Sequence, residues 1–161
     1  MKNVLKLSLA AVAIAALSAC GGGDSTDVTD VYVGTWKSAC YAGTSSTGQA
    51  FYTKRIRTLS KVSATELAGS TILDSPFSDA GCKNVAGTWN SNAASNTKYV
   101  LGAKANFLGA NTDSYVATFS DNTQSAGFSV VNNSTQLYLV EYAIGAAIPT
   151  GWSSTSPYTK Q

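Results

Sequence analysis

The stretch from Gly127 to Tyr142, GFSVVNNSTQLYLVEY, decides the fold. Two short runs of apolar and β-branched residues flank Asn132 and Asn133. Because asparagine tolerates positive φ, this pair predicts a tight hairpin turn. The returning run has two apolar or amphipathic faces, with Leu137 and Leu139 on one and Tyr138, Val140 and Tyr142 on the other. A strand covered on both faces is typical of a barrel or a sandwich rather than of an open sheet with one wet face.

The rest of the chain after the first 30 residues is also typical of strands. It is rich in Thr, Ser, Val, Tyr and Gly and poor in Glu, Lys, Leu and Met, which favours pleated sheet and turns over helix. Together with the hairpin, the further segments 32–38, 49–59, 66–73, 82–90, 98–103 and 115–119 predict about eight short strands. Residues 63–68 and 103–110 could each form one helical turn. Gly69 interrupts a strand and indicates a bulge or a close backbone approach.

The N-terminus has the order of a secretory signal. Lys2 and Lys6 precede an apolar run from Leu7 to Leu17. This run is too short to span a bilayer, which needs about 20 apolar residues. A positive segment followed by a short apolar core indicates export.

The end of that run, Leu17-Ser18-Ala19-Cys20, resembles the lipobox of bacterial lipoproteins. The resemblance implies that Cys20 is lipidated and becomes the mature N-terminus, with several acyl chains anchoring the protein stably. Gly21 follows Cys20 where an Asp would favour retention at the inner membrane. The resemblance therefore implies an outer-membrane lipoprotein that faces the periplasm. The alternative is an ordinary secretory signal with a chance cysteine.

These features divide the chain into three parts. Residues 1–19 are the expected signal peptide, 20–30 a flexible tether and 31–161 a single domain, which is long enough to bury a core. The tether is rich in Gly, Ser and Asp, and its three aspartates, Asp24, Asp27 and Asp30, lack the ligand spacing of a calcium loop.

The charge of the mature chain is balanced. Without Lys2 and Lys6, nine of the 11 basic residues remain against nine acidic ones. No basic block offers a surface for nucleic acid. The one basic cluster, Lys54, Arg55, Arg57 and Lys61, is interpreted as the solvated face of one strand.

Two cysteines remain once Cys20 is assigned to lipid. An even pair in an exported protein predicts a disulfide between Cys40 and Cys82. Free thiols or a metal pair are the alternatives. The chain has no His and no CxxC, so a zinc site has too few ligands, and we expect no metal and no cofactor.

The sequence offers little catalytic chemistry. The absence of His excludes Ser-His-Asp and Cys-His arrangements, and no Gly-rich phosphate loop occurs. Glu141 is the one acid inside an otherwise apolar strand. It is either a carboxylate that contacts a ligand or a residue at a strand edge, and we expect no enzyme.

Gly34-Thr35-Trp36 resembles the Gly-x-Trp that opens many lipocalins, and the nearby Cys40 is similar to small exported lipoproteins with a lipocalin-like barrel. The tail segments Ile148-Pro149-Thr150 and Pro157-Tyr158 also resemble the closing segment of such proteins. The resemblance implies an antiparallel, about eight-stranded, up-and-down barrel whose closed end is plugged by Trp36. The chain departs from the family in having no clear C-terminal helix and no Arg placed to cap that Trp. A β-sandwich is the alternative.

Two functions are consistent with such an all-β domain. The first is non-catalytic binding of a small apolar ligand inside the barrel by Phe51, Tyr99, Tyr138 and Tyr142. The second is an interaction or accessory role, in which the tyrosines and tryptophans dock on another envelope component.

Overall fold

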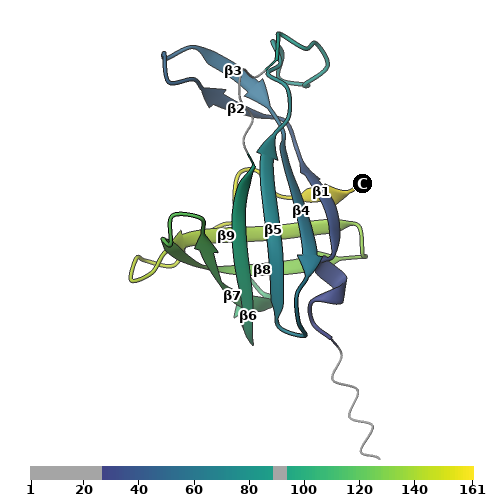
Figure 1. Cartoon of the computed structure of the whole chain (residues 1–161), viewed down its shortest axis with the longest axis vertical. Coiled ribbons are helices and arrows are strands. Elements are labelled where there is room, and N and C mark those ends of the chain that lie inside the picture. Colours follow the sequence, from purple (N-terminus) through teal and green to yellow (C-terminus); the bar gives the residue numbers. More distant parts are fainter. Residues whose placement is uncertain (1–26, 89–93) are drawn as a thin grey trace, which may run out of the picture.

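The computed structural model describes residues 27–88 and 94–161, which form a closed antiparallel barrel (Figure 1). Neighbouring strands around the barrel follow the order β1-β10-β9-β8-β7-β6-β5-β4. Their bounds are β1 Gly34–Ser38, β4 Arg55–Lys61, β5 Glu66–Leu73, β6 Ser95–Phe107, β7 Ala110–Phe119, β8 Gln124–Asn132, β9 Gln136–Ala143 and β10 Tyr158–Lys160. The prediction of an all-β antiparallel barrel is confirmed, and the sandwich alternative is not adopted.

A second, two-stranded sheet is inserted between β1 and β4. It consists of β2 (Tyr41–Thr44) and β3 (Ala50–Thr53), and it projects from one end of the barrel (Figure 1). The disulfide between Cys40 and Cys82, with 5.7 Å between the Cα atoms, ties the base of this hairpin to the segment after β5. The disulfide prediction is therefore confirmed.

The hairpin on which the fold prediction rests is present. Strand β8 pairs with β9 up to the partners Asn132 and Gln136. The residues with positive φ are Asn133 (50°) and Ser134 (58°), and the amide of Thr135 donates a 3.1 Å hydrogen bond to the carbonyl of Asn132. The turn is centred one residue later than predicted.

Several of the expected segments differ in the structure, and the strands expected at 98–103 and 115–119 are longer, as β6 and β7. The segment 49–59 breaks at Lys54 into β3 and β4, because the chain leaves the inserted hairpin there to join the barrel. In the described part of 82–90 only Val85 forms a bridge, to Phe77. The two expected helical turns are absent: Glu66–Leu73 is entirely strand, and 103–110 is the end of β6 and a tight turn. Leu108 (φ 52°) and Gly109 (φ 79°) form that turn.

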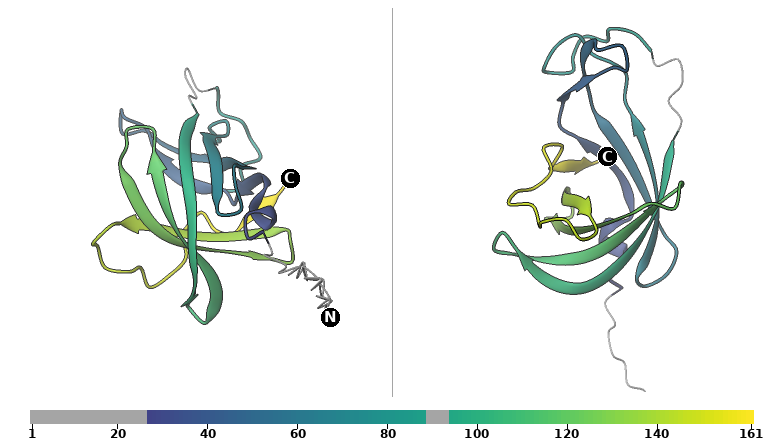
Figure 2. Two further views of the ribbon diagram at one scale, coloured as in Figure 1. Left: turned by 60° about the horizontal axis from the view of Figure 1, so that its bottom comes forward. Right: turned by 90° about the vertical axis from the view of Figure 1, so that its left-hand side faces the viewer.

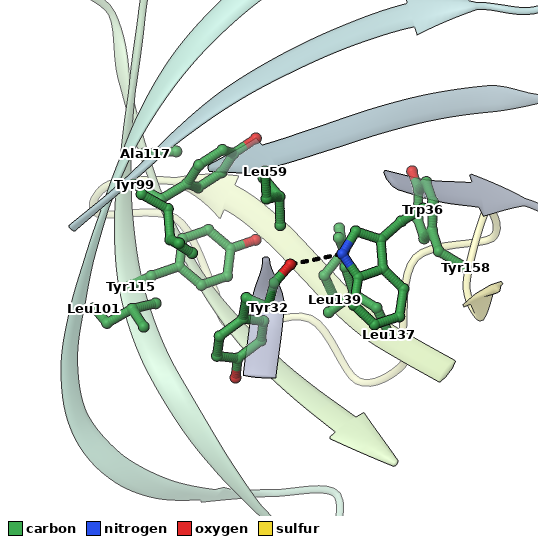
Figure 3. Close-up of a cluster of buried hydrophobic side chains, with 11 residues drawn as sticks. Tyr32, Trp36, Leu59, Tyr99, Leu101, Tyr115, Ala117, Leu137, Leu139 and Tyr158 are labelled. Atoms are coloured by element: carbon green, nitrogen blue, oxygen red, sulfur yellow. Dashed lines mark hydrogen bonds between the residues drawn. The ribbon is translucent and has the colours of Figure 1, made fainter. Parts of the chain in front are cut away.

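One end of the barrel is closed by a helical turn, η1 (Asp30–Tyr32), where a strand had been predicted from Tyr32 (Figure 2). Trp36 is fully buried there, and its indole Nε1 donates a 2.7 Å hydrogen bond to the carbonyl of Tyr32 (Figure 3). The ammonium of Lys160 lies 5.1 Å from the Trp36 ring centre. Lys160 thus provides the cation that covers this Trp, a position at which the sequence offered no Arg.

Ordered packing begins before the predicted domain boundary at residue 31. Thr29 is fully buried and Val28 packs against the core. Lys61 forms ion pairs with Asp27 and Asp30. The C-terminal part of the expected tether is therefore held against the closed end of the barrel, whereas Asp24 and Cys20 lie outside the described residues.

Two glycines let aromatic rings approach the inner wall closely. A Cβ at Gly69 would stand 2.5 Å from the ring of Tyr99. A Cβ at Gly127 would collide with the ring of Tyr115 and with a backbone carbonyl. Of the two alternatives expected at Gly69, a bulge or a close approach, the structure shows the close approach. The two glycines set the positions of the tyrosines at the centre of the barrel.

Candidate functional site: the mouth of the barrel

The inward face of β4 carries a charged residue into the barrel. Arg55, Arg57 and Leu59 alternate on that face, and Arg57 is only 4% exposed. The interpretation of the basic cluster as a solvated strand face is therefore wrong for Arg57. The two-residue period that brings Leu59 into the core brings Arg57 in with it.

Arg57 is held by groups from three other strands. Its Nη1 donates hydrogen bonds to the hydroxyl of Tyr99 on β6 (2.7 Å) and to Oε1 of Glu141 on β9 (3.1 Å). The guanidinium also lies 5.6 Å from the ring centre of Tyr99 and 5.7 Å from that of Tyr158 on β10. These contacts stabilise a charge that would be costly to bury alone.

The ionisation of this cluster follows from its surroundings. Burial disfavours the charged form of Arg57, but the nearby Tyr99 and Glu141 oxygens outweigh burial and raise its pKa, so it stays protonated. Burial also raises the pKa of the Tyr99 hydroxyl, against the opposing effect of Arg57. The pKa of Tyr115 is raised well above its usual value, first by burial and then by Glu141. Arg57 is therefore a guanidinium cation with neutral phenols beside it.

The interior below Arg57 is almost filled. Leucine and tyrosine side chains leave a cavity of about 20 Å³, and Arg57 and Tyr99 border it on the mouth side. Figure 3 shows Tyr99 and Tyr115 projecting side by side from the same wall into this core, with ring centres 5.7 Å apart. A cavity of this size has room for about one water, so the closed interior does not accommodate a drug-sized ligand in this conformation.

Above Arg57 the barrel opens into a mouth of about 510 Å³. This volume lies within the usual range of ligand sites, about 300 to 1,000 Å³. The lining combines charged, hydroxyl and apolar groups, among them Arg55, Arg57, Thr97, Tyr99, Phe119 and Glu141. We call these six residues the mouth cluster.

The groups of the mouth cluster are suited to binding. Its fixed guanidinium, carboxylate and hydroxyls suit recognition of a polar group, while Phe119 offers an apolar contact. Among residues 27–88 and 94–161, no group of three or more Cys, Asp and Glu side chains is placed to hold a metal ion.

The structure does not bring the four predicted ligand residues together. Tyr99 points into the barrel, as expected. Phe51 lies on β3, outside the barrel, with its ring over Gly43. Tyr138 and Tyr142 were expected in the interior, and this prediction is wrong. Side chains alternate between the two faces of β9, and these two tyrosines lie on its outer face together with Val140.

Both of these tyrosines belong to an aromatic cluster on the outer wall. Tyr138 lies 5.7 Å from the ring of Trp152, and Tyr142 lies 6.1 Å from that of Phe128. The members of the mouth cluster that sequence reasoning missed as site residues are Arg55, Arg57, Thr97 and Phe119. The available signal was the alternation of the two arginines with Leu59, which predicts an inward position once the strand is known.

The mouth lies at the end of the barrel opposite η1. The inserted β2–β3 hairpin rises from the rim beside Arg55, whereas η1 and Asp27 lie at the closed end (Figures 1 and 2). The described chain therefore enters the domain at the end farthest from the candidate site.

Comparisons with models of protein families, with curated proteins and with solved structures found no match to this chain.

Proposed function

We propose that the protein is a non-catalytic binding module that holds a small amphiphilic molecule in the mouth of its barrel. The observation that carries this proposal is the open volume of about 510 Å³ above the buried Arg57, next to an interior of only about 20 Å³. The expected binding of an apolar ligand deep in the barrel is thus replaced by binding at its mouth. There the polar groups of the cluster fix one end of the ligand, and Leu73 and Phe119 contact the other.

We further propose that this module is anchored in the cell envelope. Lys2 and Lys6, the apolar run and the lipobox-like Leu17–Cys20 support export and lipidation at Cys20. The Cys40–Cys82 disulfide suits an oxidising compartment such as the periplasm. The described residues contain no helix with the length and apolarity of a membrane span. The anchor that we propose is the lipid on Cys20, with the outer membrane as its location.

The direction in which the chain enters the domain gives this proposal a geometry. Because residues 27–30 pack at the closed end, an anchor at Cys20 places that end toward the membrane and the mouth away from it. The mouth is then open to solutes of the periplasm.

Incorporation of labelled palmitate tests lipidation at Cys20. We expect the wild-type chain to be labelled and the Cys20→Ala variant not to be. Equal labelling of both chains contradicts lipidation at this cysteine.

Native mass spectrometry of the chain beginning at Gly21, purified from an oxidising compartment, tests the binding function. We expect a small mass that accompanies the folded protein and is lost on denaturation. A protein that is empty and takes up no amphiphilic probe contradicts the proposal.

A second candidate, docking on another envelope component, is favoured by an apolar row on the outer wall. Val100, Val116, Ala126 and Tyr142 are register partners across β6, β7, β8 and β9, and Val100 and Val116 are 39% and 37% exposed. Exposed apolar patches mark interaction sites. Under this alternative, a photo-crosslinking residue at position 116 captures a specific envelope protein and one at position 98 does not.

A further inference from the structure

The charges of the mouth cluster are unequal. The charged side chains that line the mouth are two guanidiniums, Arg55 and Arg57, and one carboxylate, Glu141. A cleft lined with an excess of positive charge attracts anions, because its low-dielectric walls focus the field of those charges. We propose, on the basis of the binding function above, that the ligand is an amphiphilic organic anion and that Glu141 occupies part of its site on Arg57.

The hydrogen bonding of Arg57 supports this proposal. Nη1 donates to Tyr99 and Glu141, whereas the buried Nε has no hydrogen-bond partner within the described residues. This guanidinium therefore has a donor that its protein partners do not use. Leaving a buried donor without a partner is costly. An anionic ligand adds the acceptor oxygens that such a group binds best.

Arg55 extends the positive surface toward the rim. It lies two residues before Arg57 on the same face of β4, is half-buried and lines the mouth. Its guanidinium lies 5.7 Å from the ring centre of Tyr41 on β2, so the inserted hairpin orients it. A headgroup in the mouth can therefore interact with a fixed cation below and with a second one at the rim.

At the floor of the mouth, Glu141 already binds to Arg57 as an anionic group. Its carboxylate, 3.1 Å from Nη1 and 23% exposed, is a built-in anion on Arg57. An incoming anion competes with it for the same cation. Loss of the Glu141 charge is therefore expected to strengthen anion binding, which is the opposite of what the loss of a ligand-binding residue does.

The apolar half of the proposed ligand has a place beside these charges. Leu73 and Phe119 line the same mouth as the two arginines. A molecule with an anionic head and a short alkyl body satisfies both parts of the lining. A purely apolar molecule leaves the arginines without a partner and desolvates them.

The test uses a dansyl-labelled undecanoic acid as a fluorescent probe on the folded chain beginning at Gly21. Decanoate, decyl phosphate and decanol, which share one alkyl length, then displace the probe. We expect at least one of the two anions to compete about tenfold more strongly than decanol. The stronger of the two identifies the headgroup as carboxylate or phosphate.

Three variants locate the effect. Arg55→Gln is expected to weaken the preferred anion about threefold to tenfold, and Glu141→Gln to strengthen it by a similar factor, with decanol unchanged in both. Lys98→Gln removes a 54% exposed charge on the outer wall and is the matched control, expected to change nothing. Far-ultraviolet circular dichroism and the denaturation midpoint establish that each variant is folded.

The outcomes separate the two proposals. If the probe binds and decanol competes as well as both anions, or if Arg55→Gln and Glu141→Gln behave as Lys98→Gln does, the anion inference is wrong and mouth binding stands. If neither the probe nor any competitor binds the folded protein, the binding function itself is wrong.

Discussion

Replacement of both Cys40 and Cys82 by serine should lower the free energy of unfolding by about 4 kcal/mol. The disulfide joins residues 42 positions apart. In the chain-entropy model, a loop of this length loses about 13 cal/mol/K on cross-linking, which gives about 4 kcal/mol at room temperature. The loss acts through the unfolded state, because β4 and β5, which lie within the loop, keep their barrel partners in the folded state.

Urea denaturation of the chain beginning at Gly21, followed by tryptophan fluorescence, measures this loss. The double variant should also show a larger dependence of unfolding free energy on urea, because its unfolded chain exposes more surface. Wild-type protein that is reduced while unfolded, alkylated and refolded is the control and should match the variant. A loss below about 1 kcal/mol with an unchanged urea dependence refutes the reasoning.

Three further changes probe the interior. Gly127→Ala should destabilise the barrel by about 1 to 3 kcal/mol in thermal or urea unfolding, because the added methyl collides with the ring of Tyr115; an unchanged midpoint contradicts that contact. Trp36→Ala should cost about 3 to 5 kcal/mol, since the side chain is fully buried and closes one end; a loss below about 1 kcal/mol contradicts its role as a plug. The stability that three buried tyrosines contribute should be constant below pH 10, the ordinary pKa of tyrosine, and fall above it. Burial raises the folded-state pKa of Tyr32, Tyr99 and Tyr115, so the unfolded chain releases these protons first; ultraviolet titration in which all tyrosines ionise together in the folded protein refutes this.

The parts of the fold that were predictable from sequence are those with local signals. The hairpin around Asn132 and Asn133 was predicted because turn residues and alternating faces occur together over a short stretch. Strand β5 was predicted with its observed bounds, Glu66–Leu73. The barrel itself followed from strand number, composition and the Gly34-Thr35-Trp36 resemblance.

The parts that were missed depend on contacts between distant segments. The three residues of β10, Tyr158–Lys160, are strand only because β1 and β9 flank them. Tyr32 forms a helical turn, with its hydroxyl 2.7 Å from the buried carboxylate of Asp113. No local pattern encodes either arrangement, because both depend on closure of the barrel.

The candidate site was only partly predictable for the same reason. Tyr99 was expected in the interior and is there, and Glu141 was singled out as an acid in an apolar strand. Arg57 was assigned to the surface, since arginine is rarely buried unless it is paired. Its partners, Tyr99 and Glu141, are 42 and 84 residues away in the chain, so the sequence alone did not show that it was paired.

Amide-resolved NMR of the chain beginning at Gly21, titrated with the dansyl-labelled undecanoic acid, tests the central claim most directly. Binding in the mouth predicts shifts that cluster at Arg55, Thr97 and Glu141 and fade toward η1 at the closed end. Shifts confined to the outer row around Val100 and Val116, or no shifts while the protein stays folded, would contradict a ligand site in the mouth of the barrel.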